Sequence, residues 1–322
     1  MGNLQELERL FSRRQFAGGA VLVLGAGVNG DDVPKWKGIL QKLLVDALIQ
    51  KSASSDAKAC ERMAESIQAK FDIYAQASLV EAILGPERLV SRLASIIYNP
   101  RQPSPVREGS LLDSVGRLCM SGSIRAVLTF NYDTYLEQVL AQRPQPMPVV
   151  VIDCLSAAGS MRVASDGGSN SLPIYHVHGL IPNPGQVLRG RDQKIVLSQT
   201  NYLSLFGQAD GEATSTPLHI FRSYQAVFIG CSLEDWNMIR LLQRSLRRRD
   251  ERPHYCLARA FHSEDHIETE DRAGLDRLLS TLWQTLGVNP VYFKEYKDIA
   301  QAVDKLVTAA ELAEKNNPKA SA

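Results

Sequence analysis

The sequence contains only five cysteines, and no two of them lie within a few residues of each other. This scatter excludes the paired spacing of a zinc ribbon and gives no indication of a disulfide framework. Isolated cysteines are typical of a reducing cytoplasm, where a free thiol is usually a small buried side chain. We therefore expect a cytoplasmic protein that binds neither zinc nor another metal. The cysteines are Cys60, Cys119, Cys154, Cys231 and Cys256.

The chain also has almost no net charge, since 36 Lys and Arg residues balance 35 Asp and Glu residues to a formal net charge of +1. Nothing global attracts it to nucleic acid or to an anionic membrane, so we expect direct binding to neither. No apolar run approaches the roughly 20 residues that cross a bilayer. The amino-terminal stretch MGNLQELERLFSRRQF carries both charge signs and lacks the apolar core of a secretory signal.

What the chain does contain is an apolar fraction of 44% in 322 residues, enough for one large domain. Short apolar runs alternate with segments of helical periodicity. This alternation predicts an α/β fold, a Rossmann-like parallel sheet with helices on both faces. We expect strands at 20–24, 124–130, 148–152, 174–179, 194–198, 226–230, 254–259 and 289–293.

Helical periodicity without strand character follows the first of these strands. We interpret residues 37–107 as a mainly helical insertion within a single domain that spans residues 1–314. Helical stretches within it are predicted at 38–50, 61–76, 77–84 and 87–98. Residues 156–171 have no periodicity and are expected to form a loop, while residues 315–322 are expected to form a disordered tail.

The first candidate site is the stretch LVLGAGVNGDDVPKW, residues 22–36, whose glycines match the dinucleotide pattern G-x-G-x-x-G. A dehydrogenase requires a helix that begins inside this pattern and an acidic residue about 20 positions on, after a second strand. Pro34 disfavours that helix because proline lacks an amide donor and clashes one turn back. Asp46 lies at the acidic position but inside a helical pattern. The stretch is therefore not typical of an ordinary dehydrogenase.

Another interpretation of the same stretch fits better. A buried strand ends at Gly25, and the loop after it exposes backbone amides that can bind phosphate. Pro34 and Trp36 then open a helix, and the indole ring of Trp36 can cover part of a nucleotide. The alternative is that Gly25 and Gly27 only make a tight strand-to-loop turn.

Two further segments carry polar side chains where predicted strands end. In LTFNYDTYLE, Asn131 and Asp133 follow a strand, and ligands of parallel sheets bind beyond the carboxyl ends of strands. Asp133 is alternatively a helix N-cap. In YHVHGLIP, His178 precedes a glycine and has the chemistry of a general base near neutral pH. His176 lies two residues earlier, and one of the two histidines is expected to be structural.

The last candidate segment is VFIGCSLEDWNMIRLL, residues 227–242. The strand ends at Gly230, and Ser232 leads into a helix with Asp235 in its first turn. The amino terminus of that helix suits a phosphate or a ribose. Alternatively, Ser232 and Asp235 only form a capping box, and the two interpretations are compatible.

The motifs follow one another in the order G-A-G, T-x-N-x-D-x-x-x-E, H-G and I-G-x-S, and this series resembles the sirtuin-like domain. The resemblance covers residues 20 to about 245. The P-x-W after the glycine loop, the N-Y-D and the I-G-x-S-x-x-D are similar in particular to the zinc-free bacterial sirtuin-like domains of anti-phage defence.

The resemblance implies a fold that binds NAD+ as substrate and cleaves the bond between nicotinamide and ribose. Carried over by residue, Asn131 would hold the ribose and the attacking water, and His178 would be the base. Asp133 would help to orient the nicotinamide. The implied cofactor-binding set is Gly25, Ala26, Gly27, Asn29, Pro34, Trp36, Thr129, Gly230, Ser232 and Asp235. Asn29 departs from the serine that is usual in that loop.

Three functions follow from the resemblance. The first is an NAD+ glycohydrolase that releases nicotinamide and ADP-ribose and depletes NAD+ in abortive infection. The second is an NAD-dependent protein deacylase or ADP-ribosyltransferase, but sirtuin deacylases generally carry a four-cysteine zinc module that this chain lacks. The third is a non-catalytic dinucleotide-sensing assembly subunit. The resemblance also implies a homo-oligomer and a separate activating partner, such as a HerA-type hexameric ATPase or a short Argonaute, and a helical insertion or 156–171 loop that gates the cleft.

Overall fold

The computed structural model of the chain describes residues 4–12, 19–51, 56–155, 171–183, 194–208, 211–232, 235–246, 253–260 and 269–315. The expected loop at 156–171 and the expected tail at 315–322 lie almost entirely outside these ranges. Within them, no helix combines the length and apolar character that a membrane span requires.

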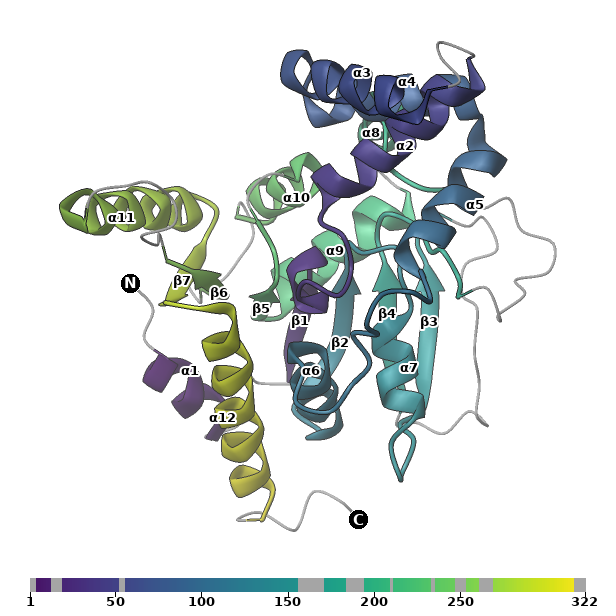
Figure 1. The fold of residues 1–322 in the computed structure, drawn as a ribbon. Coiled ribbons are helices and arrows are strands. Elements are labelled where there is room, and N and C mark those ends of the chain that lie inside the picture. Colours follow the sequence, from purple (N-terminus) through teal and green to yellow (C-terminus); the bar gives the residue numbers. More distant parts are fainter. Residues whose placement is uncertain are drawn as a thin grey trace.

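In the described part of the chain, seven strands form one sheet in which every neighbouring pair is parallel (Figure 1). The strand order is β3-β4-β2-β1-β5-β6-β7. The strands are β1 (Ala20–Leu24), β2 (Ile124–Thr129), β3 (Val149–Asp153), β4 (Leu172–His176), β5 (Ala226–Ile229), β6 (His254–Arg259) and β7 (Val288–Phe293). The predicted α/β, Rossmann-like class is confirmed.

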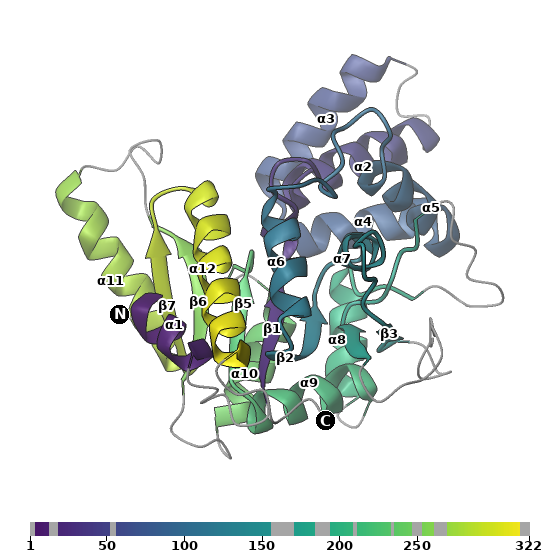
Figure 2. The same ribbon diagram turned by 90° about the horizontal axis from the view of Figure 1, so that it is seen from below.

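Side chains of each central strand alternate between two apolar cores, which is why these strands appear in the sequence as continuous apolar runs. In β1, Leu22 and Leu24 join one core, and Val21 and Val23 join the other. The first core is covered by α1 (Leu4–Ser12), α6 (Leu111–Met120), α7 (Tyr135–Ala141) and α12 (Tyr296–Lys315). The second core is covered by α9 (Glu212–Ser223), α10 (Trp236–Leu246) and α11 (Thr269–Thr285). Figure 2 shows α6 and α7 on the opposite side of the sheet from α9 and α10.

The predicted helical insertion is confirmed between β1 and β2. It contains α2 (Trp36–Gln50), α3 (Ala57–Lys70), α4 (Ile73–Leu84) and α5 (Pro86–Ile97), which lie beyond the carboxyl ends of the strands (Figure 1). The stretch predicted as one helix at 61–76 is split, because the Asp72 carboxylate accepts the amides of Tyr74 and Ala75, both at 2.9 Å, and starts a new helix. From the other half of the chain, α8 (Gln199–Gly207) packs against α4.

The strand predicted at 194–198 is wrong. Val196 N donates to His178 O at 2.9 Å, and the Asn201 side chain accepts the amides of Leu197 and Ser198 at 3.1 and 2.9 Å. These bonds occupy three backbone amides outside the sheet, so the apolar run is buried in a segment without regular secondary structure. The strand predicted at 174–179 also ends earlier, at His176, and His178 lies in the turn that follows.

The order of the strands creates a crevice beside β1. Strands β2, β4 and β3 lie, in that order, on one side of β1. After β4 the chain crosses to the other side of β1, where β5, β6 and β7 follow. In open parallel sheets, ligands bind outside the carboxyl ends of the strands at the point where the order reverses. That point lies between β1 and β5, so the turn that starts at Gly25 and the turn at Gly230 flank it.

Candidate functional site

A cleft of about 940 Å³ opens at this point of the sheet. Its volume is at the upper end of the roughly 300–1,000 Å³ that is typical of small-molecule sites. Every predicted site residue except Thr129 lines the cleft. These residues are Gly25, Ala26, Gly27, Asn29, Pro34, Trp36, Asn131, Asp133, His178, Gly230, Ser232 and Asp235. The tertiary structure thus brings four motifs that are far apart in the sequence to one place.

The turn after β1 packs directly against the turn after β5. Gly27 N donates to Gly230 O at 2.9 Å. A Cβ atom at Gly25 would lie 2.5 Å from Gly230 O, and one at Gly230 would lie 2.3 Å from Val28 N. Gly230 also has a φ of 69°, where glycine is favoured. The close approach of the two turns therefore accounts for these glycines, as the tight-turn alternative predicts.

The backbone after Gly25 forms one 3₁₀ turn, Ala26–Asn29, rather than an open loop. Several amides here already donate to backbone carbonyls, so they are not available to a phosphate. They belong to Gly25, Gly27, Val28 and Gly30. The expectation of a loop with freely exposed amides is therefore wrong for these four positions, because the two packed turns bond to each other and within themselves.

The helix predicted after Pro34 begins at Trp36, as expected. The Trp36 ring lies 6.3 Å from the Tyr132 ring, and both line the cleft. Toward α12, Lys35 Nζ and Arg259 Cζ lie 5.8 and 5.5 Å from the centre of the Tyr296 ring. The cleft therefore has an aromatic wall near the glycine turn and two cations near the end of β6.

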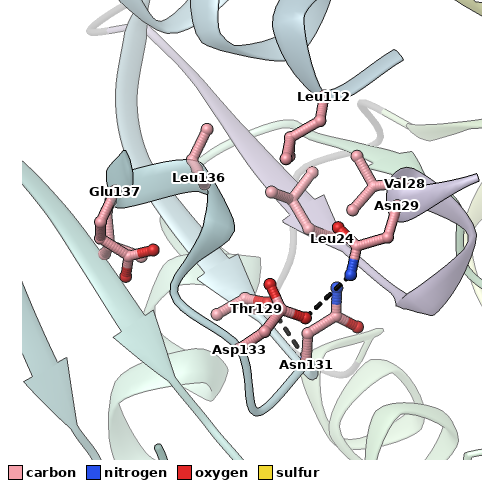
Figure 3. Close-up of a pocket in the computed structure, with 10 residues that line it drawn as sticks. Leu24, Val28, Asn29, Leu112, Thr129, Asn131, Asp133, Leu136 and Glu137 are labelled. Atoms are coloured by element: carbon pink, nitrogen blue, oxygen red, sulfur yellow. Dashed lines mark hydrogen bonds between the residues drawn. The ribbon is translucent and has the colours of Figure 1, made fainter. Parts of the chain in front are cut away.

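Asn29 and Asp133 face each other beside a small cavity of about 10 Å³ behind the cleft (Figure 3). Asn29 Nδ2 donates to Asp133 Oδ2 at 2.8 Å, and Tyr135 N donates to Asp133 Oδ1 at 3.2 Å. Burial raises the pKa of Asp133, although the bonds from Asn29 and Tyr135 oppose the shift. Thr129 lines the same cavity, and its Oγ1 accepts the Asn131 amide at 3.1 Å. The N-cap of α7 is Thr134, so the N-cap alternative for Asp133 is wrong. Asp133 stands one residue earlier, where it accepts the first amide of the helix and holds Asn29.

Asn131 is held from its side chain and from its backbone. Its Nδ2 donates to Gly25 O at 3.2 Å, which fixes the amide plane relative to the glycine turn. Among the described residues, no group donates to its Oδ1. This leaves the Oδ1 of a buried, oriented amide as an acceptor beside the cleft.

His176 is fully buried behind Asn131. Its Nδ1 lies 3.3 Å from Asn131 O, and its Nε2 lies 2.7 Å from Glu137 Oε1. Both neighbours are acceptors when Glu137 is ionised, so the geometry suits a doubly protonated ring. Burial opposes the charge, but Glu137, Asp133 and the bond to Asn131 together raise the pKa of His176. His176 is thus the structural histidine of the two, and it supports the backbone of Asn131.

His178 has a different environment in the turn after β4. Its ring packs edge-on against Phe130 at 5.0 Å and Tyr202 at 5.5 Å. Its Nε2 has no hydrogen-bond partner among the described residues and lies 3.7 Å from Asp235 Oδ2. Burial lowers the pKa of His178, and Asp235 opposes this only in part. The imidazole is therefore uncharged near neutral pH, as a general base must be.

The predicted capping box of Ser232 and Asp235 is wrong. Helix α10 begins at Trp236, and Asp235 Oδ1 accepts the Met238 amide at 2.7 Å. Asp235 is therefore the capping side chain, because it stands directly before the helix while Ser232 is too far upstream. Asp235 Oδ2 accepts a hydrogen bond from Tyr202 Oη at 2.5 Å.

Sequence reasoning misses most of the aromatic side chains of the cleft, among them Phe130, Tyr132 and Tyr202. Phe130 and Tyr132 flank Asn131, so their position after a strand was an available signal. Tyr202 comes from α8, whose sequence shows only ordinary helical periodicity. In the described part of the chain, no group of three or more His, Cys, Asp or Glu side chains is arranged to hold a metal ion.

Comparison with known proteins gives a weak similarity to a solved structure and a match to a family model. Among solved structures, the chain is similar to one titled "Structural Basis for the Mechanism and Regulation of Sir2 Enzymes", with 12% identity, coverage of 97% of this chain and 98% of that chain, and a TM-score of 0.40. Comparison with curated proteins gives no match. The family model described as a SIR2-like domain matches residues 125–291, from β2 through β7, more than half of the chain. The sheet, the cleft motifs and this match together assign the chain to the SIR2-like family.

Proposed function

We propose that this protein is an NAD+ hydrolase that cleaves the nicotinamide–ribose bond and releases nicotinamide and ADP-ribose. The observation that carries the proposal is the convergence of Asn131 and His178 on one cleft at the switch point of the sheet. The two side chains differ as the reaction requires, one an oriented amide and the other an uncharged buried imidazole. The match to the SIR2-like family supports NAD+ as the ligand.

In the proposed reaction, a water oxygen forms a bond to the anomeric carbon of the ribose while the bond from that carbon to nicotinamide breaks. The electron pair of the broken bond neutralises the cationic ring nitrogen, so the leaving group needs no acid. Asn131 Oδ1 accepts from the water or a ribose hydroxyl, and His178 Nε2 takes the proton that the water loses. Because the transition state is cation-like at the sugar, electron-rich neighbours favour it.

Asp133 has a supporting part in this proposal. Both its oxygens already accept hydrogen bonds, from Asn29 and Tyr135. It therefore orients Asn29 and the Asn131 turn, and contact with nicotinamide would require one of these bonds to change. Lys35 and Arg259 provide positive charge for the diphosphate, since the amides of the glycine turn are largely occupied.

We further propose that the hydrolase is an effector of anti-phage defence that depletes NAD+. The support for this role is the resemblance of P-x-W, N-Y-D and I-G-x-S-x-x-D to zinc-free bacterial domains of that kind. The same resemblance supports self-association and activation by a separate partner, for which a HerA-type ATPase and a short Argonaute are the candidates. Co-expression with each candidate, followed by size-exclusion chromatography, tests the partnership.

The enzymatic test is NAD+ turnover by the purified protein with nicotinamide and ADP-ribose both quantified. Asn131→Ala and His178→Ala are each expected to lower turnover by about two orders of magnitude or more, the usual size of an acid–base contribution. His219→Ala is the matched control, because His219 is exposed on α9 and does not line the cleft. Undiminished turnover in both cleft variants contradicts the site. A wild-type protein that stays inactive with every candidate partner favours the dinucleotide-sensing alternative.

A further inference from the structure

Asp235 Oδ2 lies between two possible donors. Tyr202 Oη donates to it at 2.5 Å, whereas His178 Nε2 lies 3.7 Å away, beyond hydrogen-bond distance. The other oxygen, Oδ1, is occupied by the Met238 amide at 2.7 Å. The phenol therefore holds the carboxylate, and His178 Nε2 is buried without a partner among the described residues.

The Tyr202 ring is clamped in this position. It packs edge-on against Tyr74 of α4 at 5.0 Å and against Phe206 at 5.9 Å. Tyr74 in turn lies 4.2 Å from the Trp236 ring at the start of α10. Burial and the nearby Asp235 raise the pKa of Tyr202, so its hydroxyl remains a donor. Removing the hydroxyl alone would leave these ring contacts in place.

Three groups from three elements contact or approach the His178 ring. They are Phe130 from the turn after β2, Tyr202 from α8 and Asp235 before α10. Of these, Asp235 is the one with a carboxyl group. Burial lowers the pKa of His178, and the Asp235 charge opposes this, so a closer approach of Asp235 would favour the protonated ring.

We propose that the Tyr202 hydroxyl is a positioning group that holds the Asp235 carboxylate away from His178, which keeps that imidazole uncharged and unpaired. Without the hydroxyl, the carboxylate would move onto Nε2 and form an ion pair with the protonated ring. An opposite charge at contact favours the charged form of a histidine, so the ring would stay protonated to higher pH. The effect on catalysis rests on the proposed function, whereas the effect on the ring does not.

The test is a pH titration of the full-length protein labelled with ¹⁵N-histidine, with the His178 resonances assigned from their loss in His178→Ala. In Tyr202→Phe, the pKa of His178 is expected to rise by about one unit or more. Tyr255→Phe is the matched control, because it removes a buried hydroxyl that bonds Glu6 outside the cleft. An unchanged or lower pKa in Tyr202→Phe overturns the proposal, and so does a ring that fails to titrate in both proteins.

Asp235→Asn supplies a second arm of the same experiment. Asparagine is as good an N-cap as aspartate, so α10 keeps its start while the charge is removed. The double variant Tyr202→Phe/Asp235→Asn is expected to titrate like Asp235→Asn alone. A rise in the pKa of His178 that persists without the Asp235 charge also overturns the proposal.

Turnover separates this inference from the proposed function. In an active preparation, the acid limb of kcat/KM for Tyr202→Phe is expected to move to higher pH by the same amount as the His178 titration. A shifted titration without any NAD+ turnover in the wild type would keep the positioning role and reject the hydrolase. NAD+ turnover by the wild type, together with an unshifted acid limb and an unshifted titration in Tyr202→Phe, would keep the hydrolase and reject the positioning role.

Discussion

Replacing Gly230 with alanine tests whether the glycines of the cleft serve the packing of two turns. The new Cβ atom would lie 2.3 Å from Val28 N and 2.7 Å from Gly27 C, both backbone atoms that cannot move alone. The positive φ costs a residue with a Cβ about 1–2 kcal/mol. Overpacking adds about 1–3 kcal/mol. We therefore expect Gly230→Ala to lower the free energy of unfolding by about 2–5 kcal/mol.

Gly122→Ala is the matched control for the backbone contribution. Gly122 has a φ of 70°, and no atom lies within 4 Å of a Cβ built there. The Gly122→Ala variant should lose only about 1–2 kcal/mol of the free energy of unfolding. Urea denaturation followed by circular dichroism measures both variants against the wild type. Equal losses in the two variants would refute the reasoning, because the close approach of the turns would then cost nothing.

Three further changes probe the buried groups behind the site and one helix contact. Glu137→Gln removes the carboxylate that faces buried His176, so the loss of stability should be largest below about pH 6.5 and shrink as pH rises through the raised pKa of His176. Urea titrations at about pH 5.5 and about pH 9 measure this, and equal losses would contradict the ion pair. Asp133→Asn removes a carboxyl group whose pKa is raised by burial. The melting temperature of the variant relative to that of the wild type should therefore rise from about pH 4 to about pH 8. A difference in melting temperature that does not change with pH would contradict the raised pKa. Gly116→Ala would add about 1 kcal/mol of helix propensity, but its Cβ would lie 2.5 Å from Val139 Cγ1. We expect a net loss in urea that Val139→Ala reverses, and a simple gain would show that α6 and α7 separate easily.

The local sequence determined most of the fold. Strands β1, β2, β5 and β6 are buried on both faces, so their apolar runs are continuous and easy to recognise. The segment at 194–198 has the same appearance but forms no strand. A short apolar run indicates burial but does not show which groups its backbone amides bond to. Here the amides donate hydrogen bonds to His178 O and to the Asn201 side chain.

The sequence also determined which motifs meet at the cleft. Parallel strands bring their carboxyl ends to one edge, so motifs that follow strands gather there whatever their separation in the chain. Asn131, His178 and Gly230 satisfy this rule, and each was recognisable from its place after a strand.

Only the tertiary structure decided which role each of these side chains has. His176 and His178 are two residues apart, yet one faces Glu137 and a backbone carbonyl while the other faces aromatic rings. Tyr202 reaches Asp235 from a helix whose own pattern gave no sign of it. The protonation state of a buried group depends on the charges and donors that surround it in space. A linear sequence records the identity of those groups but not the distances between them.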